Sequence, residues 1–173
     1  DMNYERGGVI YSDSDIATYA RPEVGNHILI GSEDPKCDIK EWVSDPDNFN
    51  TDFSDQWKTM VMRLAQRLPN LGIPEHAKGV VSLYDVSDDW MPIYDKSDLK
   101  GFYMAVGTSG NQFKNAPVVG KIMQKLVRSC ENGIDHDKTP VQFKLENIQK
   151  SISLGAFSRN REINKNSSFS VIG

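Results

Sequence analysis

Residues 101–117 read GFYMAVGTSGNQFKNAP and join three patterns in one short run. The first six residues are almost continuously apolar, which is typical of a strand buried on both faces. A polar turn with Gly107 and Gly110 follows, and Pro117 then suits the first position of a helix. We therefore expect a buried strand, a glycine-bearing turn and a helix that runs from Pro117 to about Cys130.

A junction of this kind can bind an anion or the electron-rich edge of a ligand. N–H groups at the start of a helix lack partners within the helix, and the helix dipole places positive charge there. Lys114 adds a cation beside the turn. The alternative is an ordinary β-to-α connection whose glycines only make the turn. The chain contains neither G-x-G-x-x-G nor a P-loop, so we expect no self-sufficient pyrophosphate site.

The segment before the junction indicates further strands and one helix. Residues 79–86 have the composition of a strand, and Ile93-Tyr94 indicates a second, short strand. Two short apolar or β-branched runs at 16–20 and 27–30, separated by turn-forming residues, indicate a hairpin. An apolar stripe predicts a helix that is capped by Ser54 or Asp52 and ended by Pro69; its members are Trp57, Val61, Leu64 and Leu68.

The remaining segments are more polar. Residues 32–52 are acidic, contain two prolines and indicate a loop. Residues 141–145 indicate one more strand, and a polar tail follows. Together these patterns predict an α+β fold.

Composition excludes several classes of protein. The 173 residues are 38% hydrophobic and 25% charged, which excludes a disordered tail and a small disulfide scaffold. A net charge of -4 makes duplex DNA or an anionic membrane surface a poor main partner. No apolar run approaches the length of a membrane span, and the first residues lack the pattern of a signal peptide. Cys37 and Cys130 have no metal or redox spacing, so we expect free thiols and a cytoplasmic location.

Other chemistry-bearing residues have structural explanations. The histidines are scattered without metal-ligand spacing, which predicts surface or local hydrogen-bonding roles and no metal site (His27, His76 and His136). Three clustered aspartates lack the twelve-residue calcium pattern and are interpreted as turn and capping carboxylates (Asp85, Asp88 and Asp89). Arg159 and Arg161 could meet a phosphate, but a solvated tail is the preferred interpretation.

Residues 79–93 read GVVSLYDVSDDWMPI and precede the 101–117 run. Together the two stretches resemble the C-terminal part of the FAD-dependent amino-acid oxidase family, in its sarcosine oxidase and glycine oxidase branch. That branch typically shows Y-x-x-T-x-D-x-x-P, then a G-x-S-G-H-G-F-K turn and a helix. Residues 19–31 resemble the hairpin of its substrate domain, and the likeness covers roughly residues 16–130.

The resemblance implies that this chain is the C-terminal portion of a larger two-domain flavoprotein. Residues 1–100 would form part of the substrate-binding domain, with its antiparallel sheet and helices. Residues 101–131 would be the returning strand, turn and helix of the FAD-binding domain, and 132–173 a C-terminal extension. The N-terminal FAD-binding half of the same protein would be the partner. We expect the isolated chain to hold no FAD, to be inactive and to expose apolar surface where that half packs.

The resemblance also implies roles for individual residues. Seven residues of the turn would lie along the flavin ring, with backbone N–H groups at its pyrimidine edge: Gly107, Thr108, Ser109, Gly110, Asn111, Gln112 and Phe113. Lys114 would face the substrate carboxylate, and Tyr84 would line the substrate pocket. The implied reaction passes a hydride from the carbon of a small amine or amino acid to FAD and leaves an imine, which water hydrolyses.

Several positions depart from the family pattern. Asn111 stands in place of the usual His and Gln112 in place of the usual Gly, which leaves the shape of the turn open. Ser82 stands where sarcosine oxidases with a covalent flavin have Cys. A hydroxyl cannot form that thioether, so we expect non-covalent FAD. Residues 27–31 lack the lysine that helps oxygen to react, so both an oxidase and a dehydrogenase stay open.

A second hypothesis is a non-catalytic α+β module for binding or subunit interaction, which would keep this half of the fold without catalysis. The reading frame upstream of Asp1 separates the two hypotheses. A strand, G-x-G-x-x-G and a helix there would favour the enzyme. A start Met or a stop codon directly before Asp1 would favour the module.

Overall fold

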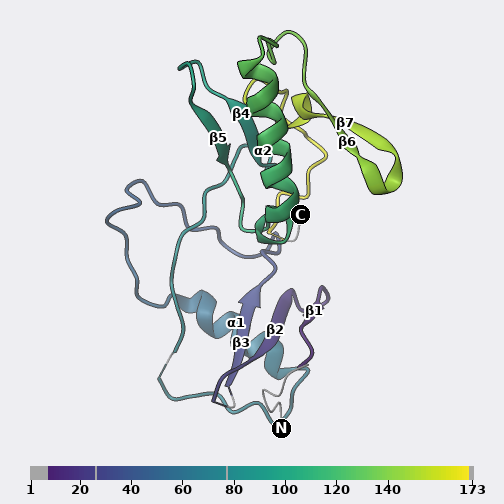
Figure 1. Ribbon diagram of the computed structural model, residues 1–173. Coiled ribbons are helices and arrows are strands. Elements are labelled where there is room, and N and C mark those ends of the chain that lie inside the picture. Colours follow the sequence, from purple (N-terminus) through teal and green to yellow (C-terminus); the bar gives the residue numbers. More distant parts are fainter. Residues whose placement is uncertain (1–7, 26, 77, 172–173) are drawn as a thin grey trace. The chain divides into compact units, whose positions relative to one another are not determined.

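The computed structural model describes residues 8–25, 27–76 and 78–171 (Figure 1). The chain divides into two compact units, Asp1–Leu83 and Tyr84–Gly173. The first contains a three-stranded antiparallel sheet and a helix, and the second contains a helix and two antiparallel hairpins. The fold is therefore α+β, as the sequence predicts. Among the described residues, no helix is both long and apolar enough to cross a membrane.

The sheet of the first unit contains the expected hairpin. Strands β2 (Thr18–Glu23) and β3 (His27–Ser32) pair antiparallel, and Gly25 adopts a left-handed φ of +79° in the turn between them. A short strand that the sequence did not indicate, β1 (Tyr11–Asp13), adds to the outer side of β2. The two-residue alternation of β2 buries Thr18, Ala20 and Pro22 on one face.

Helix α1 (Asp55–Ala65) packs against β2 and β3. Ser54 caps it by accepting a hydrogen bond from the Gln56 amide, and Val61 and Leu64 are buried, which confirms the predicted cap and stripe. The loop of residues 33–54 has no helix or strand, as expected. Asp38 fixes part of this loop, because its carboxylate pairs with Arg63 of α1 at 2.5 Å.

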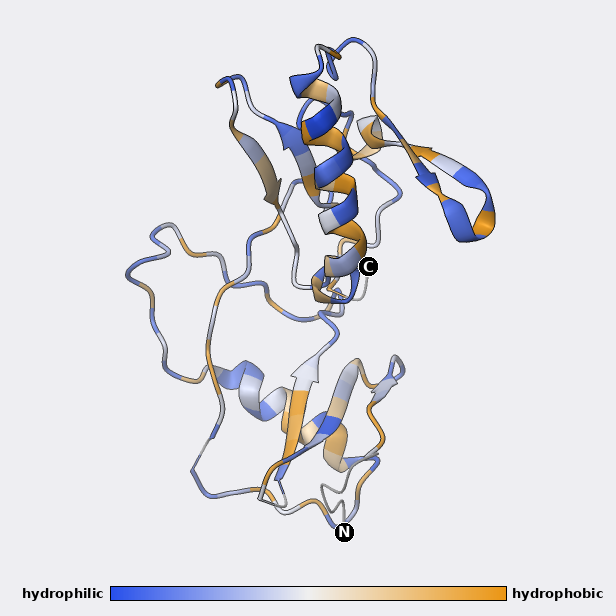
Figure 2. Cartoon of the chain, in the orientation of Figure 1, coloured by the Kyte–Doolittle hydropathy of each residue, from blue (hydrophilic) through white to orange (hydrophobic). Residues whose placement is uncertain are grey.

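The second unit is built around helix α2 (Ala116–Glu131), which packs against β4 (Ile93–Lys96). Strand β4 pairs antiparallel with β5 (Tyr103–Val106), so both predicted strands and the predicted helix are present. A short 3-10 helix, η1 (Phe113–Asn115), leads directly into α2. Apolar and polar residues alternate around α2 with the helical period, as the orange and blue bands in Figure 2 show.

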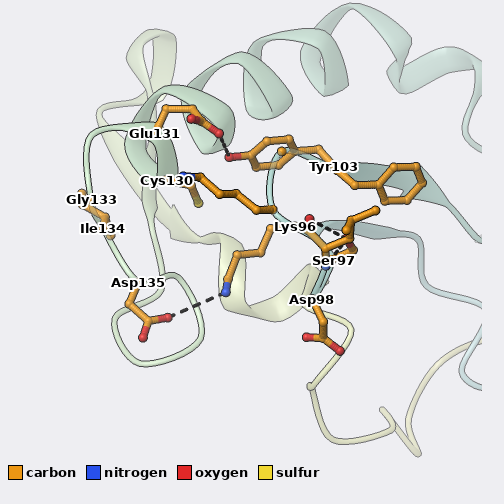
Figure 3. A pocket seen from close by; sticks show the side chains of 13 residues that line it. Lys96, Ser97, Asp98, Tyr103, Cys130, Glu131, Gly133, Ile134 and Asp135 are labelled. Atoms are coloured by element: carbon orange, nitrogen blue, oxygen red, sulfur yellow. Dashed lines mark hydrogen bonds and ion pairs between the residues drawn. The ribbon is translucent and has the colours of Figure 1, made fainter.

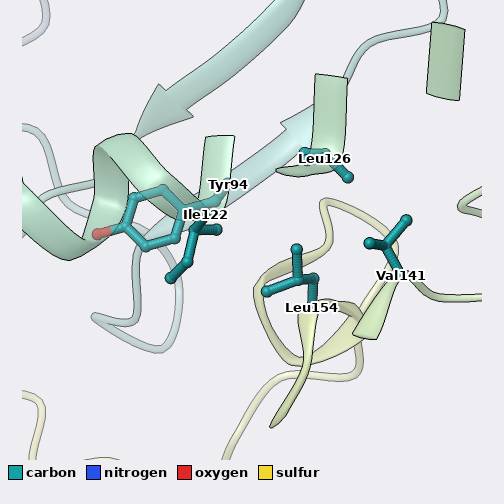
Figure 4. Close-up of a cluster of buried hydrophobic side chains, with 5 residues drawn as sticks. All are labelled: Tyr94, Ile122, Leu126, Val141 and Leu154. Atoms are coloured by element: carbon teal, nitrogen blue, oxygen red, sulfur yellow. The ribbon is translucent and has the colours of Figure 1, made fainter. Parts of the chain in front are cut away.

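The core of the second unit joins three distant segments. Its buried cluster contains Tyr94 from β4, Ile122 and Leu126 from α2, and Val141 and Leu154 from the C-terminal segment (Figure 4). The backbone of the last two residues is also joined, because the Leu154 amide donates to the Val141 carbonyl at 2.9 Å. Residues 141–154, which follow α2, therefore contribute to the core.

This segment is more ordered than a polar tail. The predicted strand is present as β6 (Gln142–Leu145), and it forms a hairpin with β7 (Lys150–Ser153) through η2 (Glu146–Ile148). A further 3-10 helix, η3 (Leu154–Phe157), follows. The prediction that Arg159 and Arg161 lie in a solvated tail is wrong. Their side chains are only 17% and 12% exposed, because each pairs with a buried carboxylate.

Two strand predictions also need correction. Residues 79–86 form no strand although they have the composition of one, and β4 and β5 pair with each other instead of with this segment. The β5 region is not buried on both faces. Among the described residues β5 pairs with β4 alone, and Phe102 and Val106 are 54% and 44% exposed. The expected exposure of apolar surface is therefore observed around this strand.

Leu126 tests the core of the second unit. We predict that Leu126→Ala lowers the free energy of unfolding by about 2–5 kcal/mol, because the side chain is fully buried and leaves a cavity. Val118→Ala on the same helix is the control, since Val118 is 41% exposed and should change stability by less than about 0.5 kcal/mol. Urea unfolding measures both. Equal losses in the two variants would contradict the assignment of the core.

Asp137 gives a prediction about pH. Hydrogen bonds from Arg159 and Lys96 lower the pKa of its carboxyl from 3.8 to about 2. The folded form therefore gains stability above the unfolded pKa, and that gain is lost as the pH falls through the folded pKa. We predict that the difference in urea midpoint between the natural protein and Asp137→Asn narrows as the pH falls from 3.8 toward 2.

The matched control is Asp47→Asn, because Asp47 is an exposed loop residue. It should leave the urea midpoint nearly unchanged over the same range. A difference for Asp137→Asn that stays constant between the two pKa values would contradict the assignment.

Candidate functional site

The turn after β5 is held by one carboxylate. Asp85 accepts hydrogen bonds from the amide of Gly107, from the amide of Thr108 at 3.1 Å and from the Thr108 hydroxyl at 2.7 Å. The backbone carbonyl of Asp85 also accepts from the Ser109 amide at 2.8 Å. Three successive N–H groups of the turn therefore bind Asp85, which confirms the interpretation of this aspartate as a turn carboxylate.

The charge of Asp85 fits this role. Partial burial alone would raise the pKa of its carboxyl, but the hydrogen bonds from Thr108 and from the Gly107 amide outweigh that effect. The pKa of the carboxyl consequently lies below its ordinary value of 3.8. Asp85 is therefore ionised near neutral pH, which is the form that accepts all of these hydrogen bonds.

Both glycines of the turn are required by its geometry. Gly107 and Gly110 have φ of +68° and +76°, a region that favours glycine. A Cβ on Gly107 would lie 3.3 Å from the Cβ of Ser87, and one on Gly110 would lie 3.1 Å from Cγ1 of Val171. Ser109 between them is also left-handed, with φ of +49°, and it is fully buried.

Asn111 and Gln112, which differ from the pattern that this turn resembles, form a polar network. The side-chain amide of Gln112 donates to Oδ1 of buried Asn111. Its oxygen accepts from the Tyr94 hydroxyl and from Nδ2 of Asn115, each at 2.9 Å. Tyr94 belongs to the buried cluster, so this network fixes the second half of the turn to the core.

The end of the turn faces solvent. Phe113 is 97% exposed and Lys114 is exposed, both in η1 at the start of α2. Pro117 lies in the first turn of α2, where its missing N–H has no cost. An apolar ring and a cation are thus presented where the helix dipole is positive.

Tyr84 lies beside the turn. It is 47% exposed, and its ring meets Trp90 edge to face with centroids 6.5 Å apart. Its Cδ2 and Cε2 atoms are 3.5 Å from the position that a Cβ on Gly110 would take. The structure thus brings Tyr84 to the glycine turn, at Gly110.

The remaining candidates lie elsewhere. His27 and His76 are exposed, whereas His136 is buried and accepts from the Val141 amide through Nδ1 at 3.0 Å. The part of the chain that the structure describes holds no group of three potential metal ligands. A pocket of about 540 Å³ lies at the other end of the β4–β5 hairpin, against the end of α2 (Figure 3). None of the predicted site residues lines this pocket.

Two long-range pairings around the turn could not be predicted from the sequence. Asp85 was recognised as a turn carboxylate, but its partners are 22 and 23 residues away in sequence. Arg161 binds buried Asp89 at 2.6 Å, 72 residues away. No local pattern identifies either pair; the one sequence signal was the density of aspartates between Tyr84 and Pro92.

Residues 3–126 match the family of FAD-dependent oxidoreductases. The match covers more than half of the chain and includes both Tyr84 and the turn from Gly107 to Lys114. The chain therefore belongs to the FAD-dependent oxidoreductase family. Comparison with curated proteins and with solved structures gave no match.

Asp85 tests the geometry of the turn. Asp85→Asn replaces an acceptor oxygen with an amide donor, so the amides of Gly107 and Thr108 cannot both keep an acceptor. Loss of such a charged acceptor costs about 1.5–3 kcal/mol, so hydrogen exchange at these amides should accelerate roughly 10- to 150-fold. Hydrogen–deuterium exchange with mass spectrometry measures this. Asp88→Asn, an exposed aspartate of the same loop, should leave the rates unchanged; equal effects would contradict the role of Asp85.

Proposed function

We propose that this chain is the C-terminal part of an FAD-dependent enzyme that oxidises a small amine or amino acid, similar to sarcosine and glycine oxidases. Its proposed partner is the N-terminal FAD-binding half of the same protein. The observation that carries the proposal is the glycine turn between β5 and α2, which ends in exposed Phe113 and Lys114 and lies beside Tyr84. Membership of the oxidoreductase family supports it.

The residues of the turn fit the edge of a flavin. Gly107 and Gly110 allow the left-handed backbone that gives the turn its shape, and Gly110 is exposed. The amides of Gly107, Thr108 and Ser109 already bind Asp85, and the Asn111 amide donates to the Thr108 carbonyl at 3.1 Å. The proposed backbone contacts with the flavin therefore narrow to the amides of Gly110, Gln112 and Phe113. These residues precede α2, whose positive end favours negative charge on the flavin.

In the proposed site Lys114 holds the substrate. It is exposed at the start of α2, where its ammonium group can bind a carboxylate as a compact cation. Tyr84 would line the same pocket and exclude water from one side. Bound FAD would supply the acceptor for the hydride that leaves the substrate carbon. The chain's own residues would hold the substrate carboxylate and shape the flavin edge.

Two further parts of the proposal rest on individual residues. Ser82 has a hydroxyl where a thioether would need a thiol, and this supports non-covalent FAD. Cys37 and Cys130 are free thiols, which supports a reducing, cytoplasmic location. Without a G-x-G-x-x-G motif the chain has no pyrophosphate anchor of its own, so the proposed activity belongs to the two halves together.

Lys114 tests the proposed function in the intact, flavin-containing protein. We predict that Lys114→Met raises the KM for a carboxylate-containing amine roughly 10- to 150-fold, because one charge-assisted contact of about 1.5–3 kcal/mol is lost. Flavin content, measured by visible absorbance, should stay nearly unchanged, because the main flavin anchor lies in the other half.

Lys121→Met is the matched control, since Lys121 is an exposed lysine of α2 two turns further on. It should change neither KM nor flavin content. Normal kinetics in Lys114→Met would remove Lys114 from the site, and loss of flavin with normal KM would assign it to the cofactor. A natural protein that binds no flavin would contradict the proposed function as a whole.

A further inference from the structure

We propose that the C-terminal segment of residues 158–171 is a positioning element of the candidate site, with Arg161 as its central residue. This segment lies outside residues 3–126, the part of the chain that matches the oxidoreductase family. That the turn binds a flavin is part of the proposed function, and this inference rests on it. The contacts that carry it are independent of any ligand.

Arg161 binds both oxygens of the buried Asp89 carboxylate. Its Nε and Nη2 atoms donate to the two oxygens of Asp89 at 3.0 and 2.6 Å, a bidentate pairing. Nη2 also donates to the Met91 carbonyl at 2.9 Å. The Asn164 amide adds a third contact to Asp89 at 3.2 Å. Hydrogen bonds from Arg161, and from backbone amides, hold the pKa of the Asp89 carboxyl well below its ordinary value.

Asp89 in turn fixes the loop that carries Tyr84. Its Oδ1 accepts from the Met91 amide at 3.1 Å. The Ser87 hydroxyl is shared between two acceptors, the Met91 carbonyl at 2.6 Å and Oδ1 of Asp89 at 3.2 Å. Trp90 follows directly, adopts a left-handed φ of +59° and is only 8% exposed. Because the Trp90 ring supports the Tyr84 ring, the position of Tyr84 depends on this loop.

The same loop supports the glycine turn. Gly107 lies so close to Ser87 that a Cβ would come within 3.3 Å of the Ser87 side chain and 3.8 Å of the Met91 carbonyl oxygen. Asp85, two residues before Ser87, binds the amides of Gly107 and Thr108. A shift of the loop would therefore move the acceptor of the turn and the surface on which Gly107 rests.

The C-terminal segment also reaches the turn directly. Cγ1 of Val171 lies 3.1 Å from the position that a Cβ on Gly110 would take, on the residue that Tyr84 also contacts. Figure 1 shows the yellow C-terminal trace returning to the start of α2. Arg161 thus acts on the turn through the Asp89 loop, and Val171 fills the space beside Gly110.

Arg159 provides a comparison within the same segment. Its side chain is similarly buried and pairs with Asp95 at 3.1 Å and with Asp137 at 2.9 Å. These partners lie on β4 and on the loop after α2, so its loss should weaken the unit without reaching the turn. Arg159→Met is therefore a control for general loss of stability.

The experiment uses the intact protein and compares Arg161→Met, Arg161→Lys and Arg159→Met. Hydrogen–deuterium exchange is followed at residues 84–91 and 107–113, together with thermal unfolding, kcat and KM. Arg161→Met should accelerate exchange in both segments at least tenfold and lower kcat/KM, whereas Arg159→Met should lower the Tm with less than a threefold change in either segment. Arg161→Lys should restore part of the protection, because lysine keeps the charge but not the bidentate geometry.

Equal exchange at 107–113 in Arg161→Met and Arg159→Met would overturn the inference, since it would show only a general loss of stability. If Arg161→Met does not fold, Arg161→Lys decides: exchange at 107–113 as slow as in the natural protein would overturn the inference. The exchange measurement needs no flavin, so it separates this inference from the proposed function, which fails if the natural protein binds no FAD.

Discussion

The carboxylate of Asp89 is almost completely buried, and a buried charge is stable only where cationic and hydrogen-bonding groups surround it. Two amides and the Ser87 hydroxyl come from nearby or returning backbone, but the compensating cation is Arg161, 72 residues further along the chain. The conformation of the loop before β4 therefore depends on a cation from the C-terminal segment of residues 158–171. This requirement makes the tail part of the second unit.

Asp95 is a second buried carboxylate that needs partners from the same segment, here Ser158 and Arg159. Its side chain is fully buried on β4, and it accepts from the Ser158 hydroxyl at 2.9 Å and from the Arg159 amide at 2.8 Å. Residues 158–161 thus satisfy two buried carboxylates on two neighbouring segments. The hydrophobic cluster closes through Val141 and Leu154 in the same region. Val141 and Leu154 anchor the preceding residues in the apolar core, and the two buried carboxylates fix the position of residues 158–161.

Local patterns predicted the elements that local forces create. Ser54 caps α1, and the predicted apolar stripe of α1 buries Val61 and Leu64, because capping and helical periodicity act within a few residues. The strand expected at 79–86 is absent, because a strand also needs a neighbour, which its own residues do not specify. Likewise Arg161 looked solvated, because its partner is distant in sequence. In the site, the glycine-bearing turn could be predicted from residue type, but the pairing of Asp85 with the amides of Gly107 and Thr108 could not.

The contacts of Asn111 and Gln112 give these two residues a structural role in the turn. Asn111 and Gln112 stand where the sarcosine and glycine oxidase pattern has a histidine and a glycine, and a side chain at the second position can make contacts that glycine cannot. Gln112 makes them by bonding to Asn111, to Asn115 and to the hydroxyl of Tyr94. Burial raises the pKa of Tyr94, so its hydroxyl keeps its proton and remains a donor to Gln112. The turn is consequently held at both ends, by Asp85 at its first amides and by the core tyrosine at its last residues, and the exposed pair Phe113 and Lys114 projects from a fixed base.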